Sequence, residues 1–169
     1  MFALVLALLA ILQTTAVPAL NEQLEFQHNE QAQDEMAEFA TVIKQVATTG
    51  TGKTASVKAG VRYPPRMFFI NPPPASGTVR TTDTATIDID NARATGETAH
   101  YWDGSTKSFE TQSVVYAPSY NEYGTAPDTV VEPWVVYNRF ERARLPVTEQ
   151  NLVDGRRLTL TTLRGERVR

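Results

Sequence analysis

The chain has 169 residues, a formal net charge of −3 and no cysteine. This length suits a single domain, and the mild acidity creates no field that would attract nucleic acid. The absence of cysteine excludes disulfides, cysteine-ligated zinc and thiol nucleophiles, although it leaves the cellular compartment open.

The first twenty residues, MFALVLALLAILQTTAVPAL, contain no charged side chain. At about 1.5 Å per residue, a helix of this length measures about 30 Å, the thickness of the hydrocarbon core of a bilayer. We therefore predict that residues 1–20 form a transmembrane or pilin-like anchor helix. Its contacts with lipid would be made by the large apolar side chains Phe2, Leu4, Leu6, Leu8, Leu9, Ile11 and Leu12.

Two other interpretations of this segment compete with the anchor. A cleaved export signal also has an apolar stretch, and small residues at Ala16 or Ala19 would suit cleavage, but no basic residue precedes the apolar run. A buried helix of a soluble protein is the third interpretation. It fits poorly because the run is apolar on every face and opens the chain.

Residues 21–49 are predicted to continue the same helix as an amphipathic stalk. Apolar residues recur at steps of three and four along one face, and Gly50 is a typical helix stop. This stripe begins near Leu20, includes Ala32 and has His28 in its gap. Its main packing positions are expected to be Leu24, Met36, Phe39, Ile43 and Val46.

The charges beside the apolar run predict an orientation. Six acidic residues lie between positions 21 and 38, and the first basic residue is Lys44. Because Lys and Arg concentrate on cytoplasmic flanks, this flank is expected to be external. The predicted location is the cell membrane, crossed once, with the C-terminal part outside.

An alternating pattern replaces the helical one from about residue 52, and Pro- and Gly-rich turns recur. The expected fold is therefore α+β, with the long N-terminal helix followed by an antiparallel, β-sandwich-like head over residues 55–169. The expected strands are 55–63, 66–70, 77–82, 85–90, 108–117, 130–140 and 157–163.

Three motifs resemble functional sites, and each has a simpler interpretation. TGTGKT at 49–54 lacks the first glycine of a phosphate-binding loop, because position 47 is Ala47, so we interpret it as a helix stop and linker. Asp88 and Asp90 in TIDIDN predict an acidic edge strand rather than a calcium site. His28 and His100 are far apart and lack metal-type companions. We expect no metal, no cofactor and no enzymatic activity.

Residues 113–140 hold six of the fifteen aromatic side chains. One interpretation is a partner-binding loop, since exposed Tyr and Trp are good anchors. The other, which we favour, is that these rings fill the core of the head. The residues concerned are Tyr116, Tyr120, Tyr123 and Trp134.

The layout resembles type IV pilin-like subunits, in which an apolar helix anchors the subunit and packs in a filament. The head is also similar to uncharacterised envelope proteins of haloarchaea, through RYPPRMFFINPPPASGTVRTTD at 62–83 and YAPSYNEYGTAPDTVVEPWVVYNRF at 116–140. The chain departs from pilin precursors because Met1 already lies in the apolar run, without a basic leader. This departure fits a piece of a longer protein.

Together, these features predict a membrane-anchored cell-surface protein with a structural or adhesive role and no catalytic activity. Its expected partners are membrane lipid and sister subunits contacted through the N-terminal helix, and no nucleic acid is expected. The alternative is a secreted β-rich binding domain whose signal peptide is cleaved.

Overall fold

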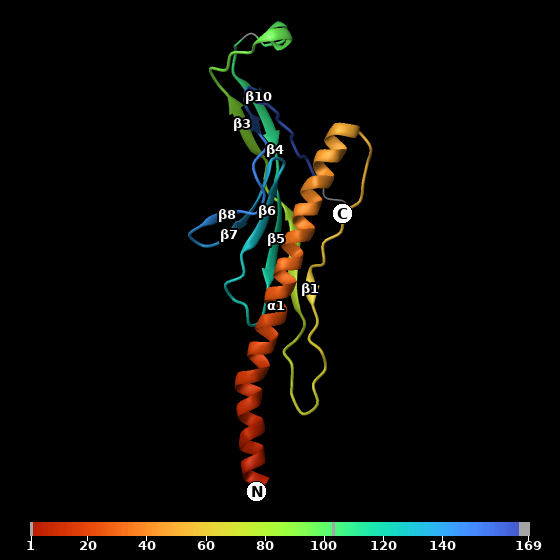
Figure 1. Cartoon of the computed structure of the whole chain (residues 1–169), viewed down its shortest axis with the longest axis vertical. Coiled ribbons are helices and arrows are strands. Elements are labelled where there is room, and N and C mark those ends of the chain that lie inside the picture. The colour runs from red at the N-terminus through yellow and green to blue at the C-terminus, as the bar shows by residue number, and fades with distance from the viewer. Residues whose placement is uncertain (1, 103, 166–169) are drawn as a thin grey trace.

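One helix of 48 residues dominates the molecule in the computed structural model, which describes residues 2–102 and 104–165. Helix α1 (Phe2–Thr49) continues through Pro18 and is about 72 Å long at 1.5 Å per residue. It ends as predicted at Gly50, whose φ of 67° is left-handed and whose N–H donates to the Val46 carbonyl at 2.8 Å. Figure 1 shows that the N-terminal half extends beyond the head and the C-terminal half lies along it.

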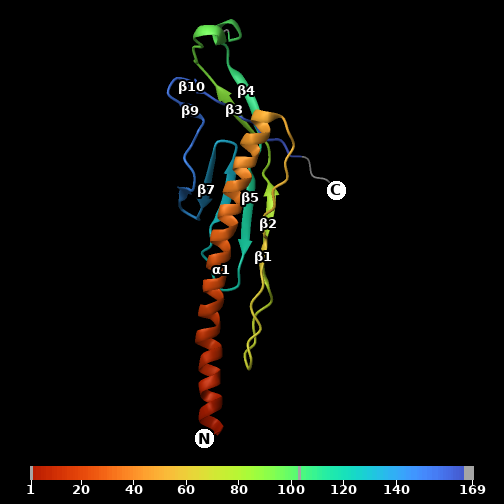
Figure 2. The same cartoon turned by 45° about the vertical axis from the view of Figure 1, so that its right-hand side comes forward.

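A six-stranded antiparallel sheet packs against the C-terminal half of α1, in the order β1-β2-β5-β6-β7-β8 (Figures 1 and 2). Its strands are β1 (Gly60–Val61), β2 (Ala75–Thr81), β5 (Val114–Ser119), β6 (Asp128–Glu132), β7 (Val135–Arg139) and β8 (Arg144–Pro146). The predicted α+β class is therefore confirmed. The helix, rather than a second large sheet, covers the inner face of this sheet.

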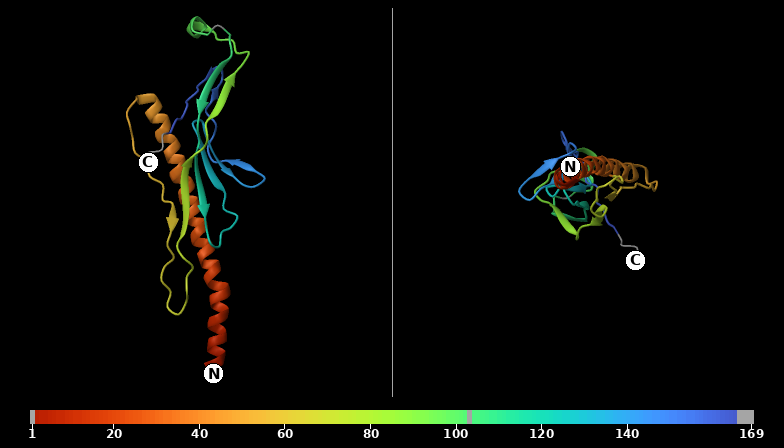
Figure 3. Two further views of the ribbon diagram at one scale, coloured as in Figure 1. Left: turned by 180° about the vertical axis from the view of Figure 1, so that it is seen from behind. Right: turned by 90° about the horizontal axis from the view of Figure 1, so that it is seen from below.

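Beyond the sheet, the chain continues from β2 into β3 (Ala85–Ile89) and returns through β4 (Lys107–Thr111) into β5. Strands β3 and β4 pair with each other and form a narrow two-stranded ribbon. Residues 82–84 lie opposite residues 112–113, so one strand has an extra residue and the ribbon bends at this bulge. The distal tip holds the short helix η1 (Gly96–His100), at the end of the molecule opposite the N-terminus (Figure 3). A second hairpin contains β9 (Val153–Asp154) and β10 (Arg157–Leu158).

The core lies between α1 and strands β5 to β7. Met36 on the helix is completely buried, as is Tyr116 on β5, and the ring of Tyr116 lies over Gly77 of β2. A Cβ at position 77 would lie 2.6 Å from that ring, so only glycine leaves room for it. The other buried members of this cluster are Ala32, Ala40, Ile43, Val114, Val131 and Val136.

Several predicted strands were wrong in extent. Residues 66–70 form the turn of a long loop instead of a strand, and only Gly60–Val61 forms a strand within 55–63. Residues 130–140 form two strands, because Pro133 and Trp134 make a two-residue turn between Glu132 and Val135. The bulge divides residues 108–117 between β4 and β5. Within 157–163, only Arg157–Leu158 forms a strand, which pairs with β9. The apolar run at 66–70 lies between prolines and pairs with no strand, although its composition predicts one.

Replacement of Met36 by Asp should destabilise the head by about 3–5 kcal/mol, because it buries an unpaired carboxylate between helix and sheet. Thermal unfolding of the full chain in detergent, followed by circular dichroism, measures the effect. Thr41→Asp, on the exposed face of the same helix, is the matched control and should melt close to the parent. Equal melting of the two variants would contradict this packing.

Candidate functional site

The apolar end of α1, residues 2–12, has no cover from the rest of the described chain. Its large side chains are exposed, Phe2 and Leu4 most of all, and only Leu9 is partly shielded. By length and composition, α1 is able to cross a membrane, and the apolar stretch that meets this criterion lies near the N-terminus. A signal sequence passes the same test, so this property by itself is weak evidence.

The described head is fixed to the middle of α1 by the carboxylate of Glu25, which is completely buried. Three consecutive backbone N–H groups, of Asn121, Glu122 and Tyr123, donate to its two oxygens at 2.9, 2.8 and 2.7 Å. The hydroxyl of Tyr63 donates to the same carboxylate. We call Glu25 with these four donors the polar junction. It is a nest of oriented amides, the geometry by which backbone binds anions.

The chain that follows β5 curves in such a way that these amides converge. The Gly124 N–H donates to the Glu122 carbonyl at 3.0 Å, and the Ala126 N–H donates to the Tyr123 carbonyl at 3.2 Å. The side-chain amide of Asn121 adds bonds to the Tyr63 hydroxyl and the Pro73 carbonyl, at 2.8 and 2.9 Å. Glu25 therefore joins three segments that are far apart in the sequence.

An aromatic cluster packs beside the polar junction. The ring of Tyr123 makes an edge contact with Phe26, and the rings of Tyr120 and Tyr123 stack with centroids 6.2 Å apart. The Tyr120 hydroxyl lies 2.7 Å from His28 Nδ1 and 3.3 Å from the Tyr116 hydroxyl. Burial raises the pKa of Tyr120, and burial together with the Glu25 carboxylate raises the pKa of Tyr63 to about 12. All these hydroxyls are neutral at physiological pH.

The two titratable groups of α1 in this region have shifted pKa values. Burial by itself would raise the pKa of Glu25, but the hydrogen bonds from Tyr63 and the three amides stabilise the carboxylate and lower the pKa overall. Burial lowers the pKa of His28 and outweighs the negative charge of Glu35, which acts in the opposite direction. Glu25 is therefore charged and His28 neutral near pH 7.

A long loop between β1 and β2, residues 62–74, lies beside the N-terminal half of α1 and is hydrogen bonded to it at two positions along the helix. Arg66 donates to Asn21 at 2.8 Å and to Asn71 at 2.5 Å. Further toward the N-terminus, the Gln13 Nε2 donates to the Ile70 carbonyl at 2.8 Å, and its Oε1 accepts from the Ile70 N–H at 3.0 Å. Figure 2 shows this loop pointing in the same direction as the apolar end.

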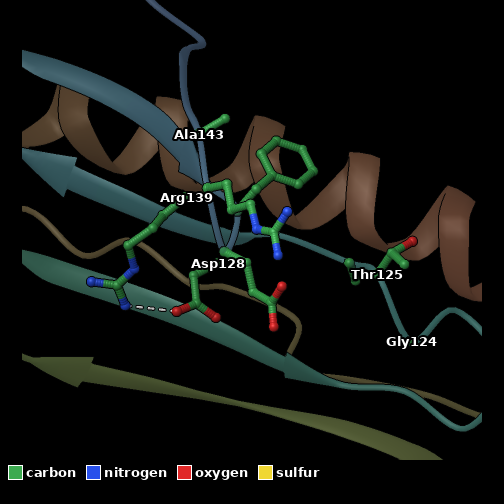
Figure 4. Close-up of a pocket in the computed structure, with 9 residues that line it drawn as sticks. Gly124, Thr125, Asp128, Arg139 and Ala143 are labelled. Atoms are coloured by element: carbon green, nitrogen blue, oxygen red, sulfur yellow. Dashed lines mark hydrogen bonds and ion pairs between the residues drawn. The ribbon is translucent and has the colours of Figure 1, made fainter.

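A hollow of about 980 Å³ lies between the start of β6 and the turn after β7 (Figure 4). Arg139 of β7 and Asp128 of β6, which are paired across the two strands, form an ion pair of 2.6 Å in its lining. The lining also contains Glu141 and Arg142, so its charges are balanced. It is open to solvent and contains no nucleophile–base pair among its lining residues. No group of three or more metal-binding side chains occurs among the residues the structure describes.

The structure brings most of the predicted packing stripe to the head. Met36 and Ile43 are buried, Phe39 packs against the same cluster, and Leu24 and Val46 are partly buried. Leu20, however, is 49% exposed, and the buried face between residues 21 and 29 is polar instead of apolar. Its members are Asn21, Glu25, His28 and Asn29. The sequence pattern places His28 in the gap of the apolar stripe, whereas it leaves Asn21, Glu25 and Asn29 outside the stripe, because an acid or amide on a helix is usually hydrated.

Three of the four aromatic residues considered for partner binding, Tyr116, Tyr120 and Tyr123, pack at the chain's own helix. Tyr116 is in the core, whereas Tyr120 and Tyr123 surround the polar junction. Trp134 is partly buried in the turn between β6 and β7, and its carbonyl accepts from the Asn151 N–H. Asp88 and Asp90 accept hydroxyl bonds from Ser108 and Thr106, both at 2.6 Å, on the β3–β4 ribbon.

Comparison with known proteins relates the chain to an archaeal protein. It is 29% identical over 133 residues to an uncharacterized protein of Archaeoglobus fulgidus, and the match covers 78% of this chain and 22% of that relative. The chain therefore spans about a fifth of the relative's length. No family model and no solved structure matches it significantly. The archaeal part of the resemblance is thus supported, while its haloarchaeal and pilin-like parts remain predictions.

Replacement of Glu25 by Gln should lower the unfolding free energy by about 2–3 kcal/mol, because the amide group places donors against donors and loses the charge-assisted bonds. Urea unfolding of the full chain in detergent measures this loss. The exposed Glu30 on the same helix is the matched control, and Glu30→Gln should leave stability nearly unchanged. An equally small effect at Glu25 would show that the junction does not hold the head.

Stability should fall in two stages as the pH drops. The pKa of His28 is lowered from 6.5, so the unfolded chain takes up the proton first and stability begins to fall below about pH 6.5. The pKa of Glu25 is lowered from 4.5, so a second loss begins below about pH 4.5. Urea unfolding at a series of pH values measures both. His28→Gln should remove the first stage only, and a parent curve that is flat between the two values would contradict the assignment.

Proposed function

We propose that this chain is a single-pass membrane protein that displays a non-catalytic β-rich head on the cell surface, with a structural or adhesive role. The observation that carries the proposal is the apolar end of α1, residues 2–12, which the described head leaves exposed. A side-chain surface of this kind requires an apolar environment, because its exposure to water is costly. Lipid supplies such an environment, and so do the same helices of sister subunits.

The polar junction supports a mechanical role for the rest of the helix. Because α1 is one continuous element, a load on the head would pass through Glu25 and the core around Met36 directly to the membrane segment. A head connected only by a flexible linker would not transmit load in this manner. The arrangement suits a protein that holds a surface structure at a defined distance and angle from the membrane.

The charge pattern supports an external head. The described part of α1 beyond residue 20 has six acidic residues before its first base, which is atypical of a cytoplasmic flank. The proposed location is therefore the cell membrane, with the C-terminal head outside. The pilin-like version of this proposal adds packing of the apolar end against sister helices. It is supported by the shape of the chain, a half-exposed helix with an antiparallel sheet on its other half.

A non-catalytic role is proposed because the shifted pKa values belong to groups that serve the fold. Glu25 is saturated by four donors, and His28 and Tyr120 face one another inside the aromatic cluster. The open hollow at Asp128 and Arg139 contains a formed ion pair instead of a free acid or base. These arrangements stabilise the helix–head contact and offer no evident group for chemistry.

The secreted alternative predicts cleavage near Ala16 or Ala19. Either cut would fall inside a continuous helix and would remove Gln13, which bonds to Ile70, and the cut at Ala19 would also remove buried Val17. These two contacts favour retention of the segment. The two proposals differ in the mass and location of the mature chain.

Expression in an archaeal host with a C-terminal tag, followed by fractionation and protease treatment of intact cells, tests the proposal. The expected result is a full-length chain in the membrane fraction whose tag is removed by external protease. Leu8→Lys should reduce membrane insertion, at a cost of about 2.5–3.5 kcal/mol in the middle of a span. Leu20→Lys is the control, because a lysine at the predicted exit is able to reach the headgroups.

A tag recovered from the medium on a chain shortened at Ala16 or Ala19 would overturn the anchor and support the secreted domain. A full-length chain whose tag resists external protease until the membrane is opened would overturn the orientation. Equal membrane recovery of Leu8→Lys and Leu20→Lys would show that the apolar end is not in lipid.

A further inference from the structure

The loop between β1 and β2 presents a concentrated apolar surface at its tip. Met67, Phe68 and Ile70 are 78%, 82% and 81% exposed, which makes them comparable to the most exposed side chains of the apolar end. No charged residue lies between Arg66 and Arg80. Residues 67–79 therefore differ from the turns at 120–127, 140–143 and 155–156, each of which contains a charged residue.

The loop holds this tip outward in a preformed geometry. Prolines precede and follow it, at 64–65 and 72–74, and restrict the backbone on both sides. The two sides are cross-linked, since the Asn71 side chain donates to the Pro64 carbonyl at 2.8 Å and accepts from Arg66. Because these bonds form within the loop, little order has to be acquired on binding.

The turn at the tip places Phe68 in a conformation that does not favour it. The Phe69 N–H approaches the Arg66 carbonyl at 3.4 Å, and Phe68 has a φ of 70° at the third position of this turn. Glycine or asparagine usually occupies that position, because a side chain with a Cβ is strained there. A large exposed ring in a strained conformation indicates that the ring is needed outside the fold.

The tip is positioned along α1 at the point where the apolar end finishes. Gln13 follows Leu12 directly, and its two bonds to Ile70 fix the tip at that height. Leu20 lies seven positions after Gln13, or about 10 Å along the helix. If the span ends near Leu20, the tip lies about 10 Å below the surface, within the 5–10 Å depth typical of interfacial segments.

The polar side chains at this depth are satisfied within the protein. Gln13 uses both its donor and its acceptor on the Ile70 backbone. The Thr14 hydroxyl bonds to the Ala10 carbonyl at 3.1 Å, and the Thr15 hydroxyl bonds to the Ile11 carbonyl at 2.7 Å. The hydrocarbon region of a bilayer supplies no hydrogen bonds, so internal pairing suits a segment whose side chains reach that region.

From this geometry we infer that the 66–71 tip is a second membrane contact, inserted into the outer interfacial layer of the lipid beside α1 and held there by Gln13. The inference rests on the proposed membrane anchor. The exposed Arg62 lies between β1 and the tip, on the side toward the head, where a guanidinium group reaches phosphate headgroups. Two contacts on one rigid body fix the tilt and rotation of the head, which a single helix would leave free.

The chain contains no cysteine, so single labels are introduced without removing any residue. The full chain is prepared as Phe68→Cys, labelled with an environment-sensitive fluorophore, and reconstituted in phosphatidylcholine vesicles. The vesicles carry a nitroxide quencher either near the headgroup or near the end of the acyl chain. Leu6→Cys marks the apolar end, and Tyr101→Cys marks the exposed opposite tip of the ribbon.

The label at position 68 is expected to lose most of its emission to the shallow nitroxide and less to the deep one. The label at position 6 should show the reverse order, and the label at position 101 should respond to neither. Gln13→Leu should weaken the quenching at position 68. Thr14→Val, whose hydroxyl bonds only to its own helix, should leave that quenching unchanged.

Quenching at position 6 without quenching at position 68 would leave the anchor in place and overturn the loop contact. Protection of position 68 from both nitroxides and from aqueous iodide would overturn it in favour of a contact with a second copy. A label at position 6 that is accessible only to iodide would overturn the membrane anchor and the loop contact together. Unchanged quenching in Gln13→Leu would overturn the role of Gln13.

Discussion

The capture of the Glu25 carboxylate by three consecutive backbone amides is the interaction on which the arrangement of helix and head depends. A buried carboxylate is tolerated only when its oxygens are fully hydrogen bonded, and here Asn121, Glu122, Tyr123 and Tyr63 satisfy them. This requirement is directional, unlike the apolar packing around Met36. It determines both the height at which the head sits on the helix and the rotation of the helix against the sheet.

The junction divides α1 into two parts with different physical demands. Beyond Ala32 the helix buries a small apolar stripe against β5, β6 and β7, as any helix on a sheet does. Before Asn21 it has apolar side chains on all faces and almost no cover from the described head. The polar face between them, Asn21 to Asn29, bonds to loops of the head and to the loop that descends from β1.

The tip of the β1–β2 loop, residues 66–71, lies beside the apolar end of α1. The loop is bonded to α1 at Asn21 through Arg66 and at Gln13 through Ile70, so it runs parallel to the helix for about 12 Å. Its exposed apolar side chains thereby extend the surface formed by residues 2–12. The hydrogen bonds that hold it are made by the few polar side chains on this part of the helix.

The local features of this protein follow from short stretches of its sequence. A charge-free run, a stripe from Ala32 to Val46 and Gly50 predicted the helix and its end, and the alternating pattern predicted the α+β class. The role of Glu25 was not predictable, because its donors lie 96 to 98 residues away and an acid on a helix normally faces water. Residues 66–70 were misread as a strand, because their apolar pattern does not reveal the partner at Gln13, 57 residues earlier. The periodicity of apolar residues indicates local secondary structure only. The pairing of polar groups that are distant in the sequence depends on the tertiary structure, because only folding brings those groups within hydrogen-bond distance.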